Sequence, residues 1–381
     1  MRITETAIPG LLIIDLDVHG DNRGWFKENW QREKFTGLAP ELASFQPVQN
    51  NISFNHAGAT RGLHAEPWDK LVSVAQGRIF GAWCDLREGS ESFGEVVTHE
   101  VGSETAVFVP RGVANGFQAL EETSYCYLVN EHWSAEARYA AVNLDIVDWP
   151  QEPTEISEKD KQHPDLAEVS PMPARRILVT GANGQLGRAL KRLLADAEFC
   201  SHADFDITNP PERNWKQYSA IINCAAYNDV NGAENDRTAA WAVNAEAPAR
   251  LARIAAENQL TLVHVSSDYI FDGTNEVHSE EELPSPLSAY GASKAAGDTA
   301  AQTAPQHYVI RTSWVFGDGE NFMSTMRRLA TKGVEPKVIH DQRGRPTFAE
   351  DLAKGIVHLL NSDADYGVYN LSNSGDTVGR D

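Results

Sequence analysis

The sequence has few cysteines and no long apolar run. Its four cysteines among 381 residues show no C-x-x-C spacing and no paired framework. We therefore expect free thiols and a reducing compartment, the cytoplasm. No stretch reaches the ~18 apolar residues of a membrane-spanning helix. The first residues are polar and the apolar run at residues 11–14 is short, so we expect no signal peptide and no membrane partner.

Positive charge is also scarce. The chain has 33 Lys and Arg against 54 Asp and Glu, a net charge of -21 at pH 7. An acidic surface of that size repels nucleic acids and anionic membranes, so we expect neither as a partner. An anionic small molecule remains compatible with this charge, because a few arginines in one cleft suffice to bind it. At ~150 residues per domain, the length indicates two or three domains.

The two halves of the chain carry different patterns of apolar residues. Up to about residue 150, short β-type runs alternate with glycines, which indicates an all-β sandwich or barrel. From Arg175, continuous apolar strands alternate with helical segments, which predicts a doubly wound parallel α/β sheet. Prolines between residues 150 and 173 are typical of a linker. The pattern alone predicts a first domain up to about residue 150, a linker at about residues 150–174 and a second domain at residues 175–381.

A glycine-rich segment joins the strand at residues 177–180 to a helix. Its sequence is Gly181-Ala182-Asn183-Gly184-Gln185-Leu186-Gly187. Glycines let the backbone turn tightly and approach a pyrophosphate, which the helix N-terminus then stabilises. The strand–turn–helix context predicts a dinucleotide site, although the G-x-x-G-x-x-G spacing differs from that of simple dehydrogenases.

Tyr290 and Lys294 are four residues apart and therefore share one face of a predicted helix. A nearby ammonium lowers the pKa of a phenol. Tyr290 can then protonate the oxygen that forms when hydride reaches a ketone, with Ser267 at a strand end as a second donor. The alternative is a surface Tyr and Lys that share a face by chance.

These motifs resemble those of extended short-chain dehydrogenases, and within them the dTDP-4-dehydrorhamnose reductase family. Further matching segments lie at residues 206–208, 223–227, 266–273, 311–315, 321–322 and 341–347. The resemblance implies a Rossmann fold that reduces a 4-keto sugar nucleotide with NAD(P)H. It implies Tyr290 as proton donor, Lys294 as its electrostatic partner and ribose ligand, and Ser267 as carbonyl polariser.

The same resemblance implies the cofactor residues. They are Gly181, Asn183, Gly184, Gln185, Leu186, Gly187, Asp206, Ile207, Ala225, Ala226 and Tyr227, together with Tyr290 and Lys294. It also implies that Trp314 borders the sugar. Residues 200–204 offer neither a clear ribose-binding acid nor an arginine for a 2′-phosphate, so NADH and NADPH both remain open. Family members continue beyond the 367–370 strand, so part of the substrate lid is expected to be absent.

Polar residues in the first half surround one histidine. Arg23, Arg61, Gln49 and Asn51 accompany His64 within β-type sequence. Arginines and amides beside a histidine make an anion site with a candidate base. A loop histidine beside surface arginines fits these residues alone equally well.

This set resembles the cupin-type (jelly-roll) dTDP-4-dehydrorhamnose 3,5-epimerase family over residues 1–165. The resemblance therefore implies a first domain at residues 1–165 and a linker at residues 166–174. Further matches lie at residues 85–87, 110–117 and 157–160. The resemblance implies His64 as base, Asp160 as its orienting acid, Tyr127 as proton donor and Lys70 near the enolate oxygen. Arg23 and Arg61 would hold the diphosphate, with Gln49 and Asn51 near the nucleotide or sugar. It also suggests a homodimer through this domain, with Arg23 drawn from the partner chain.

Two positions depart from the epimerase pattern. Asn115 stands where the family has an active-site histidine, and we expect it to contact the substrate. Trp133 stands where the family has a second tyrosine. The segment between His64 and Lys70 is shorter than usual. We see no His/His/Glu ligand set and expect no metal.

The leading hypothesis is a fused enzyme of dTDP-L-rhamnose biosynthesis, in which the first domain epimerises a nucleotide sugar and the second reduces its ketone. The alternative keeps the reductase and makes the β domain a non-catalytic binding or dimerisation module, which Asn115 motivates. A cofactor-binding regulatory subunit is a third interpretation, and the intact Ser267, Tyr290 and Lys294 argue against it. The sequence leaves open a dTDP or a UDP sugar.

Overall fold

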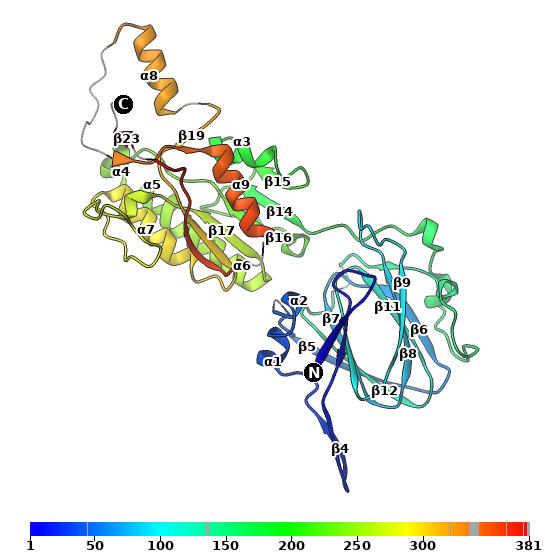
Figure 1. The fold of residues 1–381 in the computed structure, drawn as a ribbon. Coiled ribbons are helices and arrows are strands. Elements are labelled where there is room, and N and C mark those ends of the chain that lie inside the picture. Colours follow the sequence, from blue (N-terminus) through cyan, green and yellow to red (C-terminus); the bar gives the residue numbers. More distant parts are fainter. Residues whose placement is uncertain are drawn as a thin grey trace. The chain divides into compact units, whose positions relative to one another are not determined.

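The chain forms two compact units, residues Met1–Ala174 and Arg175–Asp381. The computed structural model describes residues 1–43, 45–134, 137–319, 321–334, 343–362, 364–375 and 377–378. In Figure 1 the first unit runs from blue to green and the second from green to red. In the part of the chain so described, no helix is long and apolar enough to cross a membrane.

The first unit is built from two antiparallel sheets. The six-stranded sheet has the order β1 (Arg2–Glu5), β2 (Leu12–Asp15), β10 (Thr105–Val109), β7 (Lys70–Gln76), β12 (Thr123–Val129) and β5 (Gln49–Asn55). The five-stranded sheet has the order β13 (Ala140–Ala141), β6 (Thr60–Ala65), β11 (Val113–Ala119), β8 (Ile79–Asp85) and β9 (Val96–Val101). Neighbouring strands run antiparallel and wrap into a barrel (Figure 1). This is the jelly-roll architecture of cupins, so the all-β prediction is confirmed.

Apolar side chains from both sheets meet inside the barrel. Successive residues of a strand point to opposite faces, so every second side chain of β7, β8, β11 and β12 enters the interior. One buried cluster contains Val72, Val74, Trp83, Val107, Phe117 and Tyr125. This core fixes the strands whose polar residues line the cavity described below.

Smaller elements lie around the barrel. The hairpin of β3 (Val18–Asp21) and β4 (Gly24–Lys27) projects away from it (Figure 1). Short helices are α1 (Arg32–Thr36) and α2 (Pro40–Ala43), and single 3-10 turns are η1 (Leu144–Ile146), η2 (Asp160–Gln162) and η3 (Leu166–Glu168).

Residues 166–174, predicted as a linker, pack against the barrel instead. Val169 and Met172 are buried in a core cluster of the first unit. The Met172 N–H donates to the Leu86 carbonyl at 2.7 Å, and its carbonyl accepts from Glu88 N–H at 2.8 Å. The prolines exclude a helix interior but not extended backbone, and the apolar side chains between them bury against the barrel.

The second unit contains a six-stranded parallel sheet. Its order is β15 (Glu198–Cys200), β14 (Arg176–Thr180), β16 (Tyr218–Asn223), β17 (Thr261–Val265), β18 (His307–Arg311) and β22 (Gly367–Asn370). Leu178 packs in a cluster with residues of α6 (Ala247–Asn258), whereas Val179 packs with α3 (Gln185–Lys191) and α9 (Ala349–Leu360). Consecutive residues of β14 are thus buried on opposite faces, which confirms the predicted doubly wound sheet.

The strand order reverses at β14. The chain passes from β14 to β15 on one side and then returns to β16 on the other. In open parallel sheets, ligands bind at the carboxyl ends of the strands next to such a reversal. The loop after β14 and the segment after β16 therefore lie where a nucleotide cofactor is expected.

The second unit contains further described elements outside this sheet. They are η4 (Trp215–Gln217), α4 (Gly232–Asn235), α5 (Arg237–Trp241), the π-helical turn η5 (Ala242–Glu246), η6 (Asp268–Ile270), α7 (Ala289–Ala301), β19 (Val315–Phe316), α8 (Phe322–Thr331), β20 (Arg343–Gly344), β21 (Thr347–Phe348) and β23 (Thr377–Val378).

Candidate active sites

His64 and Asp160 form a hydrogen-bonded pair in the first unit. His64 lies in β6 and Asp160 begins η2, and the distance between His64 Nε2 and Asp160 Oδ1 is 2.9 Å. The other carboxylate oxygen accepts the Gly62 N–H at 3.2 Å. The Asp160 N–H donates to Ser157 Oγ at 3.1 Å. These contacts fix the carboxylate against the imidazole.

The surroundings keep Asp160 ionised. Burial acts to raise the pKa of this carboxyl, but its hydrogen bond to His64, the charge on that ring and the Gly62 N–H lower the pKa to about 2. The carboxylate is therefore charged at neutral pH. A buried carboxylate in that state holds an imidazole in one orientation and stabilises its protonated form.

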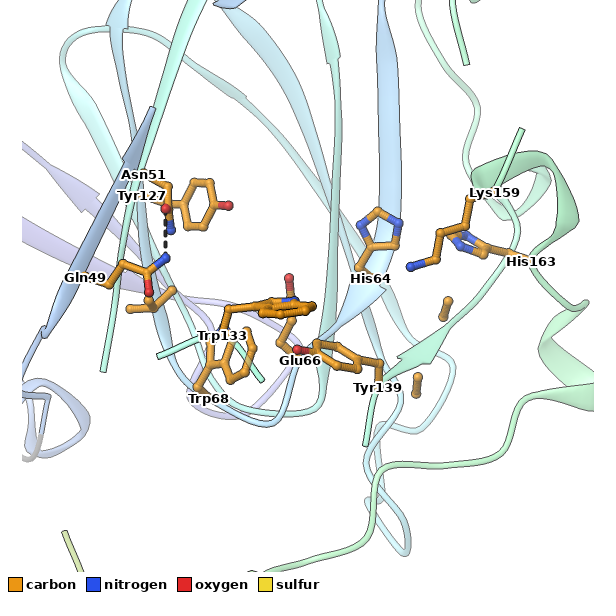
Figure 2. Close-up of a pocket in the computed structure, with 13 residues that line it drawn as sticks. Gln49, Asn51, His64, Glu66, Trp68, Tyr127, Trp133, Tyr139, Lys159 and His163 are labelled. Atoms are coloured by element: carbon orange, nitrogen blue, oxygen red, sulfur yellow. Dashed lines mark hydrogen bonds between the residues drawn. The ribbon is translucent and has the colours of Figure 1, made fainter. Parts of the chain in front are cut away.

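His64 faces a cavity of about 560 Å³. Tyr127, Gln49 and Asn51 line the same cavity from the opposite sheet, and Figure 2 shows them across it from His64. Gln49 Nε2 donates to Asn51 Oδ1 at 2.9 Å. Burial, and next the charge of Glu66, raise the pKa of Tyr127, so its phenol is protonated at neutral pH. The rest of the wall comprises Glu66, Trp68, Val129, Trp133, Tyr139, Ala140, Ala141, Lys159 and His163.

Lys70 lies behind this wall rather than in it. Its Nζ is 2.5 Å from Glu66 Oε2, and its side chain is only 7% exposed. The ammonium also lies 5.3 Å from the ring centroid of Tyr127. Glu66, and not Lys70, is among the lining residues. The sequence analysis missed this ion pair, which neutralises the lysine expected near the enolate oxygen.

Neither predicted arginine lines the cavity. Arg61 Nε donates to Asn55 Oδ1 at 2.7 Å. Arg23 sits at the tip of the β3–β4 hairpin, where it pairs with Asp21 and its side chain is 90% exposed. Among the described residues of one chain, the predicted diphosphate site is therefore not assembled, because the hairpin projects away from the barrel (Figure 1).

Asn115 is a packing residue, which corrects its predicted contact with substrate. It stands opposite His64 in the register of β11 and β6. Its Oδ1 accepts from Trp83 Nε1 at 2.9 Å, and its Nδ2 donates to the Tyr125 hydroxyl at 3.1 Å. Both ends of the amide are thus engaged inside the barrel, and the residue is only 8% exposed.

His163 is a site residue that the sequence analysis missed. It lines the cavity beside His64, with ring centroids 5.0 Å apart and planes at 81°. Its position three residues after Asp160 was the available signal, because one 3-10 turn brings residues i and i+3 to the same side.

The glycine loop of the second unit is required by close backbone contacts. Gly181 has φ +69°, and a Cβ there would lie 2.8 Å from Ala225 N. A Cβ on Gly187 would lie 2.5 Å from the Gly181 carbonyl oxygen. Gly184 caps α3, which begins at Gln185. The loop after β14 therefore packs directly against the segment after β16 and against the start of α3.

Ser267, which follows β17, meets Tyr290 in the first turn of α7. Burial raises the pKa of Tyr290 to about 12, while a hydrogen bond with the Ser267 side chain acts in the opposite direction. Lys294 is 2% exposed and donates from Nζ to the Val265 carbonyl at 2.7 Å. The expected lowering of the phenol pKa is therefore wrong for this state, because burial and the charges of Asp268 and Tyr269 raise the pKa and only the hydrogen bond with Ser267 opposes them.

Lys294 is itself perturbed. Burial lowers its pKa to about 8, and the charges of Asp298 and Cys224 act to raise it. Asp298 lies one helical turn along α7 and forms an ion pair with Arg311, from Nε to Oδ2 at 3.1 Å. The ammonium is thus held within a buried charge network.

Among the other predicted cofactor positions, residues 225–227 are partly buried, whereas Leu186 and Ile207 lie in the core. Asn244 fixes Tyr227, accepting its N–H at 2.9 Å and donating to its carbonyl at 3.1 Å. The backbone N–H of Ala225 donates to Asn223 Oδ1 at 3.3 Å, and Ala226 is partly buried. Leu186 and Ile207 pack in the core, so their side chains are not available to a ligand.

Polar and aromatic groups complete this set. Asp206 Oδ1 accepts from the Thr208 N–H at 2.9 Å and hydroxyl at 2.7 Å, which lowers its pKa. The Asn183 carbonyl accepts from Arg188 at 2.6 Å, and Gln185 Nε2 lies 3.5 Å from the Val315 carbonyl. The Trp314 ring packs over Gly344. Asp341 and Gln342, two of the matching motif residues, lie outside the described residues.

Comparison with known proteins assigns each unit. Residues 5–168 match the family model of dTDP-4-dehydrorhamnose 3,5-epimerase, and residues 175–379 match that of the RmlD substrate binding domain. The chain belongs to both families. Both resemblances are thus confirmed, and we call the units the epimerase unit and the reductase unit.

Individual relatives cover the two units separately. The RmlC homolog protein of Streptococcus pyogenes serotype M6 is 51% identical over 176 residues, 43% of this chain and 89% of that protein. The dTDP-4-dehydrorhamnose reductase of Mycobacterium tuberculosis is 38% identical over 216 residues, 53% of this chain and 71% of that protein. A solved dTDP-4-dehydrorhamnose reductase from Clostridium acetobutylicum is 35% identical with a TM-score of 0.50, covering 53% of this chain and 76% of that one.

Proposed function

We propose that the chain carries out two successive reactions on one 4-keto sugar nucleotide. The epimerase unit inverts C3 and C5 of dTDP-4-dehydro-6-deoxyglucose, and the reductase unit then reduces the C4 ketone with NAD(P)H to give dTDP-L-rhamnose. Membership of both families in one chain supports this function. The observation that carries the first step is the His64–Asp160 pair across one cavity from Tyr127.

Proton abstraction is the chemistry that this cavity supports. A C–H bond beside a ketone is acidic because the resulting carbanion is delocalised onto the carbonyl oxygen. His64 accepts that proton, and the ionised Asp160 stabilises the imidazolium at 2.9 Å. Tyr127 keeps its proton at neutral pH and delivers it to the opposite face of the carbon. Return of a proton from the other side inverts the stereocentre.

The reductase unit fits a nicotinamide dinucleotide. Gly181 and Gly187 let the loop after β14 pack directly against neighbouring backbone, which gives the strand–turn–helix arrangement that holds a pyrophosphate in dinucleotide sites. When bound, the cofactor supplies hydride to the ketone carbon. Tyr290 donates its proton to the ketone oxygen, and Ser267 orients the phenol through their hydrogen bond. The choice between NADH and NADPH stays open in this proposal.

Fusion of the two units has a physical reason. Epimerisation beside a ketone is reversible, and hydride transfer removes that ketone. Tethering raises the effective concentration of the second enzyme near the product of the first. The reductase unit therefore draws the epimerisation forward.

A homodimer through the epimerase unit completes this proposal. Trp25 and Phe26 in the β3–β4 hairpin are 48% and 63% exposed, and the hairpin projects from the barrel (Figure 1). We propose that it extends to a second copy and delivers Arg23 to the cavity of that copy. This accounts for a diphosphate arginine that no single chain places at its own cavity.

The alternative function keeps the reductase and leaves the epimerase unit non-catalytic. The engaged amide of Asn115 favours it, because the family's histidine at this position is lost. Full-length protein and its His64→Asn and Tyr290→Phe variants, each given dTDP-4-keto-6-deoxyglucose and either nicotinamide, separate the two functions. We expect dTDP-L-rhamnose from the wild type, no exchange of the C3 and C5 protons in His64→Asn, and exchange without reduction in Tyr290→Phe. Reduction without exchange in the wild type would support the alternative.

A further inference from the structure

His163 is a buried histidine in an unusual state. Its side chain is 7% exposed. In the described part of the chain, neither of its ring nitrogens has a hydrogen-bond partner. Asp160 Oδ1 is 3.8 Å from His163 Nε2, too far for a hydrogen bond, and the Gly62 backbone lies close enough to the ring to raise its pKa. A buried polar group without a protein partner requires an explanation, and a role as a metal ligand is one.

The same ring belongs to a cluster with the geometry of a ligand set. His64, Asp160 and His163 each offer one ligand atom, and these atoms all lie within 4.8 Å of one another. Asp160 Oδ1 is 2.9 Å from His64 Nε2 and 3.8 Å from His163 Nε2. Within the described residues, this is the one group of three or more such side chains.

The chemistry of the donors selects the class of ion. Two imidazoles and one carboxylate suit zinc and other divalent first-row transition metals, whereas magnesium and calcium prefer oxygen ligands alone. The Gly62 N–H bonded to the second oxygen of Asp160 orients that carboxylate, as outer partners do in metal sites. The His64 side chain is 36% exposed and lines the cavity, so an ion can reach the cluster from there.

We propose that His64, Asp160 and His163 form a binding site for a divalent transition-metal ion such as Zn²⁺, and that occupancy of this site and epimerisation exclude each other. The second part rests on the proposed role of His64 as base. A neutral imidazole has one nitrogen lone pair to give. When an ion takes the lone pair of Nε2, the proton resides on Nδ1 and His64 accepts none from a substrate. The same ion neutralises the Asp160 carboxylate.

Metal titration of the full chain tests the site directly. Protein freed of metals with EDTA is titrated with Zn²⁺ by calorimetry and with Co²⁺ by visible absorption. We expect one ion per chain and an affinity at least about tenfold weaker in His163→Gln. His99→Gln, a histidine of β9 in the same unit, is the matched control and is expected to bind as the wild type does. Equal affinity in the wild type and His163→Gln would overturn the site.

A second variant keeps the test decisive if His163→Gln fails to fold. In His163→Cys a thiolate replaces the imidazole, and a thiolate is also a good zinc and cobalt ligand. We expect Co²⁺ bound to this variant to show a thiolate-to-cobalt charge-transfer band that the wild type lacks. Bound Co²⁺ without that band would place the ion elsewhere and contradict the proposal.

The functional part is measured as solvent deuterium exchange at C3 and C5 of the keto sugar. We expect exchange by the wild type to fall in proportion to zinc occupancy and to return with EDTA, while reduction at the other unit persists. Exchange that continues at full occupancy would refute the exclusion. Failure of the proposed epimerase function gives a different result from failure of the metal site. In that case the metal-free protein shows no exchange, while the cobalt spectrum still reports bound ion.

Discussion

His64 Nε2 and Asp160 Oδ1 lie 2.9 Å apart although 96 residues separate them in the chain. One residue belongs to a strand of the barrel, and the other to the segment that closes over it. Epimerisation requires a base whose positive charge is tolerated inside a half-buried cavity. The ionised carboxylate meets that requirement, because its pKa of about 2 keeps it charged.

The charge of Asp160 is the first target. Asp160→Asn preserves shape and one hydrogen bond but removes the charge that stabilises the imidazolium. We expect the rate of deuterium exchange at C3 and C5 to fall by roughly 10²–10⁴-fold, the range associated with general acid–base catalysis. Reduction of ready-made dTDP-4-dehydrorhamnose by the other unit is the internal control and should be unchanged. Near-normal exchange in this variant would contradict the role of the dyad.

A substitution at Asn115 tests whether this position serves core packing or catalysis. Asn115→His restores the residue usual in the epimerase family, but it breaks the hydrogen bonds to Trp83 and Tyr125 and adds volume to the barrel core. We expect the epimerase unit to lose about 1–3 kcal/mol of unfolding free energy, with no gain in exchange rate. Urea denaturation and the exchange assay measure the two effects. Faster exchange at unchanged stability would show that the position is catalytic.

The pH dependence of reduction depends on Lys294. Its pKa of about 8 means that the buried ammonium is lost as pH rises through that value, so we expect the rate of ketone reduction to decline above pH 8. The negative charge of Asp298 acts to raise this pKa. Asp298→Asn therefore lowers it further and shifts the decline to lower pH. A shift to higher pH, or none, would contradict this assignment.

The hairpin arginine is tested by mixing variants. Arg23→Ala and His64→Asn are each expected to lose most epimerase activity. The first lacks the arginine proposed to hold the diphosphate in the partner's cavity, and the second lacks the proposed base. In a mixed dimer, the chain that keeps His64 receives Arg23 from its partner, so one site is complete. We expect activity to return on mixing, with sedimentation showing a dimer. Two inactive variants that stay inactive after subunit exchange would argue against a shared site.

The class of each sheet could be predicted from the sequence. The strands of the reductase unit are apolar at consecutive positions, so both of their faces must be buried, as in a parallel sheet covered by helices on each side. Leu178 and Val179 are buried on opposite faces, as this pattern predicts. The glycines at positions 181 and 187 were also predictable, because only a residue without a Cβ tolerates contacts of 2.5–2.8 Å with backbone.

Side-chain partnerships were less predictable. The ion pair of Lys70 with Glu66 depends on how a shortened segment returns to the barrel, and no residue pattern encodes that path. Asn115 was predicted to contact substrate because of its position in a motif. In the structure its amide is hydrogen-bonded to the indole of Trp83 and the phenol of Tyr125. His163 was missed because proximity to His64 arises only when the closing segment folds over β6.

The central claim is that one ketone serves first as an electron sink for a neighbouring carbanion and then as a hydride acceptor. The most direct measurement is mass spectrometry and NMR of the sugar formed by the full chain from dTDP-4-keto-6-deoxyglucose in D₂O with reduced nicotinamide. We predict dTDP-L-rhamnose with solvent deuterium at both C3 and C5. A reduced sugar of unchanged configuration that carries no deuterium at either carbon would contradict the account.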